Sequence, residues 1–321
     1  MFQTPILLIT FNRPNHTRLV FDAIKKQKPT KLYVFQDGAR KGNESDVEKC
    51  KEVRALFEEA INWDCEIKTF YSEINLGCGP GPAAGISWFF DQVDAGIIIE
   101  DDAIPADDFF GYAEELLVRY KADKDIRAIG SMKVDDRVYG DGSYYFSMMN
   151  RTLCAWASWK RAWTDFDYSL SQITKKDFYK ALSYYKVTLR EREYWYDRLL
   201  EVQKDGYGDS SWDQQFWMSI WLNRGKGISP NVNLSTNIGF DNGATHTFDE
   251  NSSAANLKNE ELKFIIHPEN ENINRKADLR FHKLYFVPFE YGMMGLKRLP
   301  SRLNKRLKRI LKHEGPWFKN C

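Results

Sequence analysis

The N-terminal third of the chain alternates short apolar runs with amphipathic stretches, and this alternation limits the possible folds more than any other feature. The apolar runs have the length and composition of buried strands. They cover residues 6–10, 31–38, 65–71 and 96–102. Helical spacing follows the first run, where Leu19, Val20, Ala23 and Ile24 are apolar. Strands that alternate with helices in this way predict an α/β fold with a mostly parallel sheet and helices on both faces.

A polar sequence marks the end of each run. QDG and EDD are the last residues of the second and fourth runs, and FNR and NLG lie after the first and third. In open α/β sheets, ligands bind beyond the carboxyl ends of the strands. We therefore expect the functional site at this edge of the sheet. The second half of the chain is less regular and contains an aromatic segment, CAWASWKRAW, a charged helical region near residues 174–204 and a helix that begins WDQQFW. Because the chain has no internal repeat and no low-complexity linker, we expect one catalytic domain over residues 1–290 and a tail over residues 291–321.

Three adjacent acids, Glu100, Asp101 and Asp102, directly follow the most strand-like run of the chain. Adjacent carboxylates repel one another unless a cation or hydrogen-bond donors neutralise them. Hard oxygen ligands at a strand end suit Mn²⁺ or Mg²⁺ bound to a diphosphate. The alternative is a solvated acidic turn. The position after a buried strand favours the metal site.

Asp37 and Arg13 end two other strands at the same predicted edge. The Asp37 carboxylate could accept a hydrogen bond from a base or a ribose, or it could form an Asx turn before Gly38. Arg13 could bind phosphate or could be an ordinary surface residue. The glycine-rich loop over residues 77–81 precedes a helix, so it is either a phosphate cradle or a stiff turn.

Two candidate residues lie later in the chain. Asp213 opens the helix that begins WDQQFW, where it is suited either to capping the helix or to acting as a general base on a hydroxyl. His246 lies in a glycine- and asparagine-rich loop and could reach phosphate or metal, or could simply be solvated. Aromatic residues make up 15% of the chain, which permits carbohydrate binding without requiring it.

Taken together and in order, several segments resemble the animal N-acetylglucosaminyltransferase that starts complex N-glycan branching, and the wider GT-A superfamily with its Rossmann-like fold. They span roughly residues 5–247, and the most specific is the pattern EDDAIPADDFF. The segments are PILLITFNR, VFQDGA, IIIEDDAIPADDFFGYAEELLVRY, LCAWASWKRAW, WDQQFWMS and SPNVNLSTNIGFDNGATH.

The resemblance implies a role for each matching residue of the donor site. Arg13 is similar to a residue that contacts the donor phosphates, and Asp37 to one that contacts the uracil ring. Glu100 would hold the donor sugar, Asp101 the ribose, and Asp102 would ligate Mn²⁺ directly.

The resemblance also implies the chemistry. Asp213 is similar to the acid that deprotonates the acceptor, and the loop from Gly239 to His246 to one that orders over the donor. Such enzymes are metal-dependent hexosyltransferases that invert the anomeric centre in one displacement. The implied donor is a UDP-sugar, with GlcNAc the best single expectation.

Two departures bear on the acceptor and the base. The relative has a pair of acids where this chain has Asp213 followed by Gln214, and it is anchored in a membrane at its N-terminus. This chain begins MFQTPILLITFNRP, without a signal peptide or membrane anchor, and its five cysteines are odd in number with no C-x-x-C pair. We therefore expect a cytoplasmic enzyme of surface polysaccharide synthesis that acts on a glycan or lipid-linked acceptor.

The tail is strongly basic. Residues 297–312 contain eight Lys or Arg and no acid, whereas the whole chain has a net charge of +1. Leu303, Leu307, Ile310 and Leu311 keep helical spacing, so residues 296–312 predict an amphipathic cationic helix that binds an anionic membrane from the cytoplasmic side. A helix packed on the catalytic domain is the alternative. We expect no nucleic-acid partner, because the rest of the chain is acidic and carries no nucleic-acid motif.

Two other functions compete with a glycosyltransferase. Sugar-nucleotide nucleotidylyltransferases share the doubly wound core, but usually carry a glycine-rich, arginine-containing loop directly after the first strand. This chain has FNRPNHTR there instead. A non-catalytic carbohydrate-binding relative that has kept the fold is the other alternative.

Overall fold

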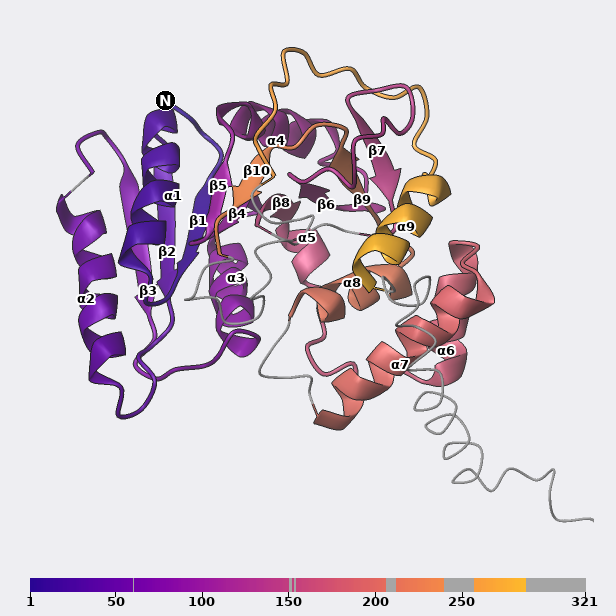
Figure 1. The fold of residues 1–321 in the computed structure, drawn as a ribbon, viewed down its shortest axis with the longest axis horizontal. Coiled ribbons are helices and arrows are strands. Elements are labelled where there is room, and N and C mark those ends of the chain that lie inside the picture. The colour runs from indigo at the N-terminus through magenta and orange to yellow at the C-terminus, as the bar shows by residue number, and fades with distance from the viewer. Residues whose placement is uncertain (60, 150–151, 153, 206–211, 240–256, 287–321) are drawn as a thin grey trace, which may run out of the picture. The chain divides into compact units, whose positions relative to one another are not determined.

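The computed structural model describes the chain except residues 60, 150–151, 153, 206–211, 240–256 and 287–321 (Figure 1). A sheet of eight strands forms its centre. The strands of this sheet are β1 (Ile6–Thr10), β2 (Lys31–Gln36), β3 (Glu66–Tyr71), β4 (Ala95–Glu100), β6 (Ile126–Gly130), β7 (Tyr144–Ser147), β8 (Ala155–Trp159) and β9 (Lys226–Pro230). The helices of the same unit are α1 (Pro14–Gln27), α2 (Glu44–Glu59), α3 (Pro80–Gln92), α4 (Asp107–Arg119), α5 (Lys160–Trp163), α6 (Lys175–Tyr184), α7 (Leu189–Asp205) and α8 (Asp213–Leu222).

The order of the strands across the sheet is β3-β2-β1-β4-β8-β6-β9-β7. Neighbours from β3 to β4 are parallel, and β6 is parallel to β9. Of these eight strands, only β7 and β8 run in the direction opposite to the other six. The expected α/β fold with a mostly parallel sheet is therefore confirmed.

Helices cover both faces of the sheet, because alternate strand residues point to opposite sides. On one face, Ile6, Leu8, Ile97 and Ile99 pack with apolar residues of α1, α2 and α4. On the other, Leu7, Ile9 and Ile98 pack with α3, α5 and α8. Strands buried on both faces need continuous apolar runs, which is why the sequence shows them as uninterrupted runs.

A second, two-stranded sheet lies just after β4. It pairs β5 (Ala103–Pro105) antiparallel with β10 (Ser235–Asn237), as Figure 1 shows. The register places Asn237 opposite Ala103, the residue after Asp102. This pairing brings a segment from late in the chain to the acids at the end of β4.

The structure defines two segments of the second half: an aromatic segment for which the sequence predicted no element, and the charged region that was expected to be helical. The segment CAWASWKRAW contains a central strand, β8, which lies between β4 and β6. All five of its residues are buried, so no alternation of apolar and polar residues marks it. The charged region near residues 174–204 is two helices, α6 and α7.

The chain divides into two compact units, residues 1–275 and 276–321. The helix α9 (Arg275–Phe281) begins at this division, and the π-helix η1 (His282–Phe286) follows it. The expected domain boundary after residue 290 and the expected basic helix both lie outside the described residues. Within the described residues, no helix is both long and apolar enough to cross a bilayer.

Candidate functional site

The three acids of the motif stand where β4 ends. Glu100 is the last residue of the strand. Residues two apart in a strand point to the same face of the sheet, so Glu100 lies on the same face as Ile98. Ile98 faces the cluster that includes residues of α8, so the alternation directs Glu100 to the same side. Asp101 and Asp102 follow in a turn before β5.

The Asp102 carboxylate has two differently used oxygens. Its Oδ2 accepts a hydrogen bond from the Arg13 guanidinium at 3.0 Å. Its Oδ1 is buried and has no hydrogen-bond partner among the described residues. A buried carboxylate oxygen without a partner is costly unless a donor or a cation meets it. Asp102 therefore has one oxygen held by the protein and one suited to a ligand.

Burial and mutual repulsion raise the pKa values of the other two acids. Burial, the Asp102 charge and then the charges of Asp213 and Asp101 raise the pKa of Glu100 well above its ordinary value. Burial and Asp102 likewise raise the pKa of Asp101 to about 7, although Arg13 and the Phe11 amide lower it. The Phe11 N–H donates to Asp101 Oδ2 at 3.1 Å. A carboxyl group can accept a hydrogen bond from a sugar hydroxyl, and in its protonated form it can also donate one.

Asp213 lies within electrostatic reach of Glu100, since its charge contributes to the raised pKa of that residue. It is the first residue of α8, and the position of that helix follows from aromatic packing beneath the site. Trp212 stacks on Trp156 of β8 with ring centroids 5.6 Å apart. Trp156 is paired with Ile98 in the sheet, which places the start of α8 beside the end of β4. The structure thus brings Asp213 within electrostatic reach of the acid motif.

Asp37 also stands at this edge, directly after β2, and its carboxylate holds the glycine-rich loop. Its oxygens accept hydrogen bonds from the amides of Leu76 at 2.8 Å and Gly77 at 3.0 Å, and from Asn75 Nδ2 at 3.0 Å. The amide of Gly38, the next residue, also donates to Oδ1 at 2.9 Å. Burial raises the pKa of Asp37, although these amide donors oppose the shift.

These contacts bear on the glycine-rich loop itself. The amides of Leu76 and Gly77 donate to Asp37, and the Gly81 amide donates to the Gly77 carbonyl at 2.9 Å. Pro80 and Pro82, in the first turn of α3, have no amide hydrogen to offer. This arrangement favours the stiff turn over the phosphate cradle.

Arg13 comes directly after Asn12, whose side chain is hydrogen-bonded to a residue of α2. Asn12 Nδ2 donates to Asp46 Oδ1 at 2.7 Å, and Arg40 binds Asp46 with its Nε and a terminal nitrogen at 2.5 and 2.8 Å. These contacts lower the pKa of Asp46 to about 2. Pro14 then begins α1, so the backbone on both sides of Arg13 is restrained.

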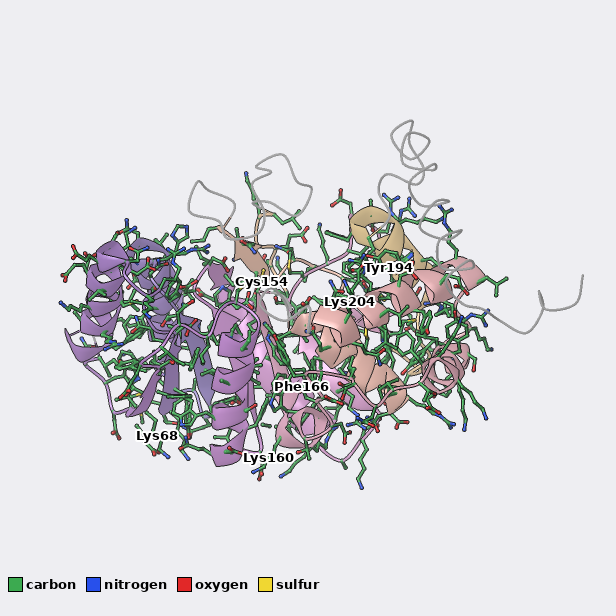
Figure 2. All side chains as sticks on the ribbon, turned by 90° about the horizontal axis from the view of Figure 1, so that it is seen from below. Lys68, Cys154, Lys160, Phe166, Tyr194 and Lys204 are labelled. Atoms are coloured by element: carbon green, nitrogen blue, oxygen red, sulfur yellow. The ribbon has the colours of Figure 1, made fainter. Side chains whose placement is uncertain are left out.

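The end of β10 contributes residues to the site, and of these only Gly239 was named from the sequence, as the first residue of the loop expected over the donor. The Ile238 amide donates to the Asp102 carbonyl at 2.8 Å, and His16 Nε2 donates to the Ile238 carbonyl at 3.2 Å. The Gly239 backbone lies against the Asp102 carboxylate. Cys154, labelled in Figure 2, accepts the Glu100 amide at its carbonyl at 3.2 Å. The signal in the sequence was the segment NIGF, in which one residue separates the asparagine from the glycine.

His246 and most of the loop from Gly239 to His246 lie outside the described residues. In the described part of the chain, no group of three or more His, Cys, Asp or Glu is arranged to hold a metal ion. A cation here would therefore take at most two such ligands from the described residues and would draw its other oxygens from a ligand such as a diphosphate. The unpartnered Asp102 Oδ1 fits that arrangement.

No family model matches the sequence. No curated protein matches it either. Several solved structures are similar in fold. One is a 4-diphosphocytidyl-2C-methyl-D-erythritol synthase from Anaerococcus prevotii, with 10% identity and a TM-score of 0.35 over 54% of this chain and 80% of that one. Another is a UDP-glucose pyrophosphorylase complexed with UDP-glucose, with 9% identity and a TM-score of 0.31 over 50% of this chain and 78% of that one.

A third similar structure, from Bacillus anthracis, is described as a glucose-1-phosphate thymidylyltransferase in complex with sucrose. It shares 11% identity and a TM-score of 0.32, over 81% of this chain and 98% of that one. The names of these three proteins belong to the alternative expected from the sequence, the nucleotidylyltransferases. At such identities and TM-scores, the activity of none of them can be transferred to this chain.

Proposed function

We propose that this chain is an enzyme that binds a nucleotide sugar at the end of β4 and transfers the sugar to a hydroxyl group. The observation that carries the proposal is the meeting of three elements, α1, β4 and α8, at one point. Arg13 from the start of α1 binds Asp102 beyond β4, and Asp213 from the start of α8 lies in the field of Glu100. A cationic group, a carboxylate with a free oxygen and a second acid are the parts that such a transfer needs.

The chain's own residues divide the work. Arg13 would bind the donor diphosphate, and Glu100 in its protonated form would hydrogen-bond the donor sugar. Asp101 would accept from the ribose. Asp37 is proposed as the contact to the base on the resemblance alone, because its carboxylate already accepts four hydrogen bonds within the protein. His246 is proposed as a further donor contact on the resemblance alone.

The transfer itself needs one base and one leaving group. The acceptor oxygen would attack the anomeric carbon as its proton passes to the Asp213 carboxylate. The bond from that carbon to the diphosphate oxygen would break, and its electron pair would leave with the nucleoside diphosphate. The configuration at the anomeric carbon would invert. A Mn²⁺ or Mg²⁺ ion held by Asp102 Oδ1 would supply charge neutralisation for the leaving diphosphate.

The substrates follow from the resemblance described above. We propose UDP-GlcNAc as the donor and a glycan or lipid-linked sugar as the acceptor, in the synthesis of a surface polysaccharide. Membrane attachment through residues 296–312 would place the enzyme beside a lipid-linked acceptor in the cytoplasm.

A nucleotidylyltransferase is the second candidate, because the proteins of similar structure include a UDP-glucose pyrophosphorylase and a glucose-1-phosphate thymidylyltransferase. The local geometry favours the first. α1 begins at Pro14, four residues after β1 ends at Thr10, so the turn between them has little room for the loop that nucleotidylyltransferases use there. Release of pyrophosphate from a nucleoside triphosphate and a sugar 1-phosphate would identify this second activity.

The experiment that tests the proposal is calorimetric titration of the full chain with a panel of nucleotide sugars, first with Mn²⁺ and then with EDTA. We expect one UDP-sugar to bind only with the metal. Asp102→Ala should weaken this binding at least tenfold. Asp107→Ala is the matched control, because Asp107 is an exposed acid of α4 and should leave binding unchanged.

Transfer is then measured separately from binding. Asp213→Asn should bind the donor within about twofold of the wild type and lose roughly 10²–10⁴-fold in kcat, the usual contribution of a general base. Failure of every nucleotide sugar to bind would overturn the proposal. Full transfer activity in Asp213→Asn would leave the donor site in place and remove Asp213 as the base.

A further inference from the structure

We infer that Gly239 and Asn237 are positioning residues that hold the Asp102 carboxylate in the orientation that binds a cation. This inference rests on the proposed function, because it concerns the same carboxylate. Neither residue belongs to the acid motif, and both reach it only through the pairing of β10 with β5.

Gly239 is required for space rather than for backbone freedom. The glycines with a positive φ among the described residues are Gly42, Gly77 and Gly140, so Gly239 has a backbone conformation that other residues can adopt. A Cβ atom there would nevertheless overlap Asp102 Oδ2 and come within 2.8 Å of Asp102 Cγ and 3.0 Å of its Cβ. The bare backbone of Gly239 therefore forms one wall of the Asp102 carboxylate.

This wall and Arg13 act on the same oxygen. Arg13 donates to Asp102 Oδ2, and Gly239 packs against that oxygen. Rotation of the Asp102 carboxylate would break its hydrogen bond with Arg13 and would be blocked by the Gly239 backbone. Oδ1, the unpartnered oxygen, is consequently held in one direction.

Asn237 holds Gly239 in place. Its Oδ1 accepts the Gly239 amide at 2.7 Å, and its Nδ2 donates to Cys154 Sγ at 3.4 Å. The Cys154 carbonyl in turn accepts the Glu100 amide, so the Asn237 side chain connects the wall to the strand that carries the acids. Cys154 has a φ of 67°, an unusual conformation for a residue with a side chain. The surrounding contacts stabilise this conformation.

The test measures Mn²⁺ binding by the loss of the free-ion EPR signal as the full chain is added in the presence of UDP. We expect Gly239→Ala to weaken Mn²⁺ binding at least tenfold, because the new methyl group pushes the carboxylate away. Gly111→Ala is the matched control. A Cβ at Gly111, within α4, would meet nothing within 4 Å, so this variant should bind Mn²⁺ as the wild type does.

The hydrogen bond between Asn237 and Cys154 is tested by substitutions of Cys154. Cys154→Ser keeps an acceptor for Asn237 Nδ2 and should bind Mn²⁺ within about twofold of the wild type, whereas Cys154→Ala removes the acceptor and should bind several-fold more weakly. Asn237→Leu, of similar size, removes both contacts and should approach Gly239→Ala. Equal Mn²⁺ binding by Cys154→Ala and the wild type would overturn the role of Asn237.

Thermal unfolding separates positioning from folding through a double-mutant cycle. Any fall in Tm caused by Gly239→Ala should largely disappear when Asp102→Ala removes the carboxylate that the methyl group meets. An equal fall in both backgrounds would overturn the inference, as would wild-type Mn²⁺ affinity in Gly239→Ala. If the wild type itself binds no Mn²⁺ with UDP, the proposed metal site fails together with the inference, which distinguishes that outcome from the others.

Discussion

At the scale of single residues, the site is built from carboxylates in different settings. Asp102 is partly exposed and paired with Arg13, Asp37 is enclosed by amide donors, Asp101 is buried and Glu100 is half-buried. Identical chemical groups therefore have different pKa values, because burial raises the pKa of Glu100 and of Asp101 whereas the Arg40 guanidinium lowers the pKa of Asp46.

Asp46 shows this most directly and allows a residue-scale prediction. Its folded pKa of about 2 is below the ordinary value of 3.8, so its contacts with Arg40 and Asn12 stabilise the fold above about pH 4 and lose that contribution as the pH falls towards 2. We expect Asp46→Asn to lower the free energy of unfolding by about 1 kcal/mol at pH 7, because Arg40 is half exposed and solvent screens the pair.

Chemical denaturation of Asp46→Asn and the wild type at several pH values checks this prediction. The difference between them should shrink from pH 5 to pH 2. A constant difference over that range would mean that Asp46 stabilises the fold through packing or hydrogen bonds that do not depend on its charge. Asp107→Asn serves as the control, since this exposed acid has only a distant Lys26 partner at 3.9 Å.

At the scale of elements, the position of α8 decides where the candidate base lies. The first turn of this helix rests on Trp156 through Trp212, whereas its last turn is held through Trp221, whose Nε1 donates to the Met148 carbonyl at 2.6 Å. The two tryptophans therefore anchor opposite ends of one helix, and only the first anchor adjoins Asp213.

This difference predicts unequal effects on catalysis from similar losses of stability. Trp212→Phe and Trp221→Phe should each cost about 1–3 kcal/mol, the first by loss of aromatic packing and the second by leaving a buried carbonyl without its donor. We expect Trp212→Phe to lower the transfer rate about tenfold and Trp221→Phe to leave it within about twofold. Steady-state rates with the donor identified by titration, compared at equal fraction folded, provide the measurement.

At the scale of the whole molecule, residues 1–275 form one compact unit, and the charge of the chain is divided unevenly. The eight basic residues at 297–312 stand against a chain with a net charge of only +1. A basic amphipathic segment attached to an acidic unit would favour an anionic membrane through the segment alone.

Flotation with vesicles tests this proposal. The full chain should float with phosphatidylglycerol-containing vesicles and remain in solution with phosphatidylcholine alone, and removal of residues 296–321 should abolish flotation. A full-length variant with Lys305, Arg306, Lys308 and Arg309 changed to Gln keeps the apolar face and should float much less. Equal flotation of the full chain and the truncated chain would remove the idea.

The sequence by itself determined the parallel half of the sheet and the place of the acids. Apolar runs mark β1 to β4 because both faces of these strands are buried, and β1 was predicted to the residue at Ile6–Thr10. The motif at Glu100 could be located because a strand end is a local feature. Arg13 and Asp37 were found for the same reason.

Only the tertiary structure decided which distant residues join those acids. Strand β8 lies antiparallel beside β4, and its Trp156 stacks on Trp212 at the start of α8. The approach of Asp213 to Glu100 therefore depends on packing between elements far apart in the chain. The contact of Gly239 with Asp102 depends on the register of β10 with β5. Residue spacing reports which face of its own element a side chain occupies. Contacts between elements arise from the packing of whole surfaces, and no local pattern carries that information.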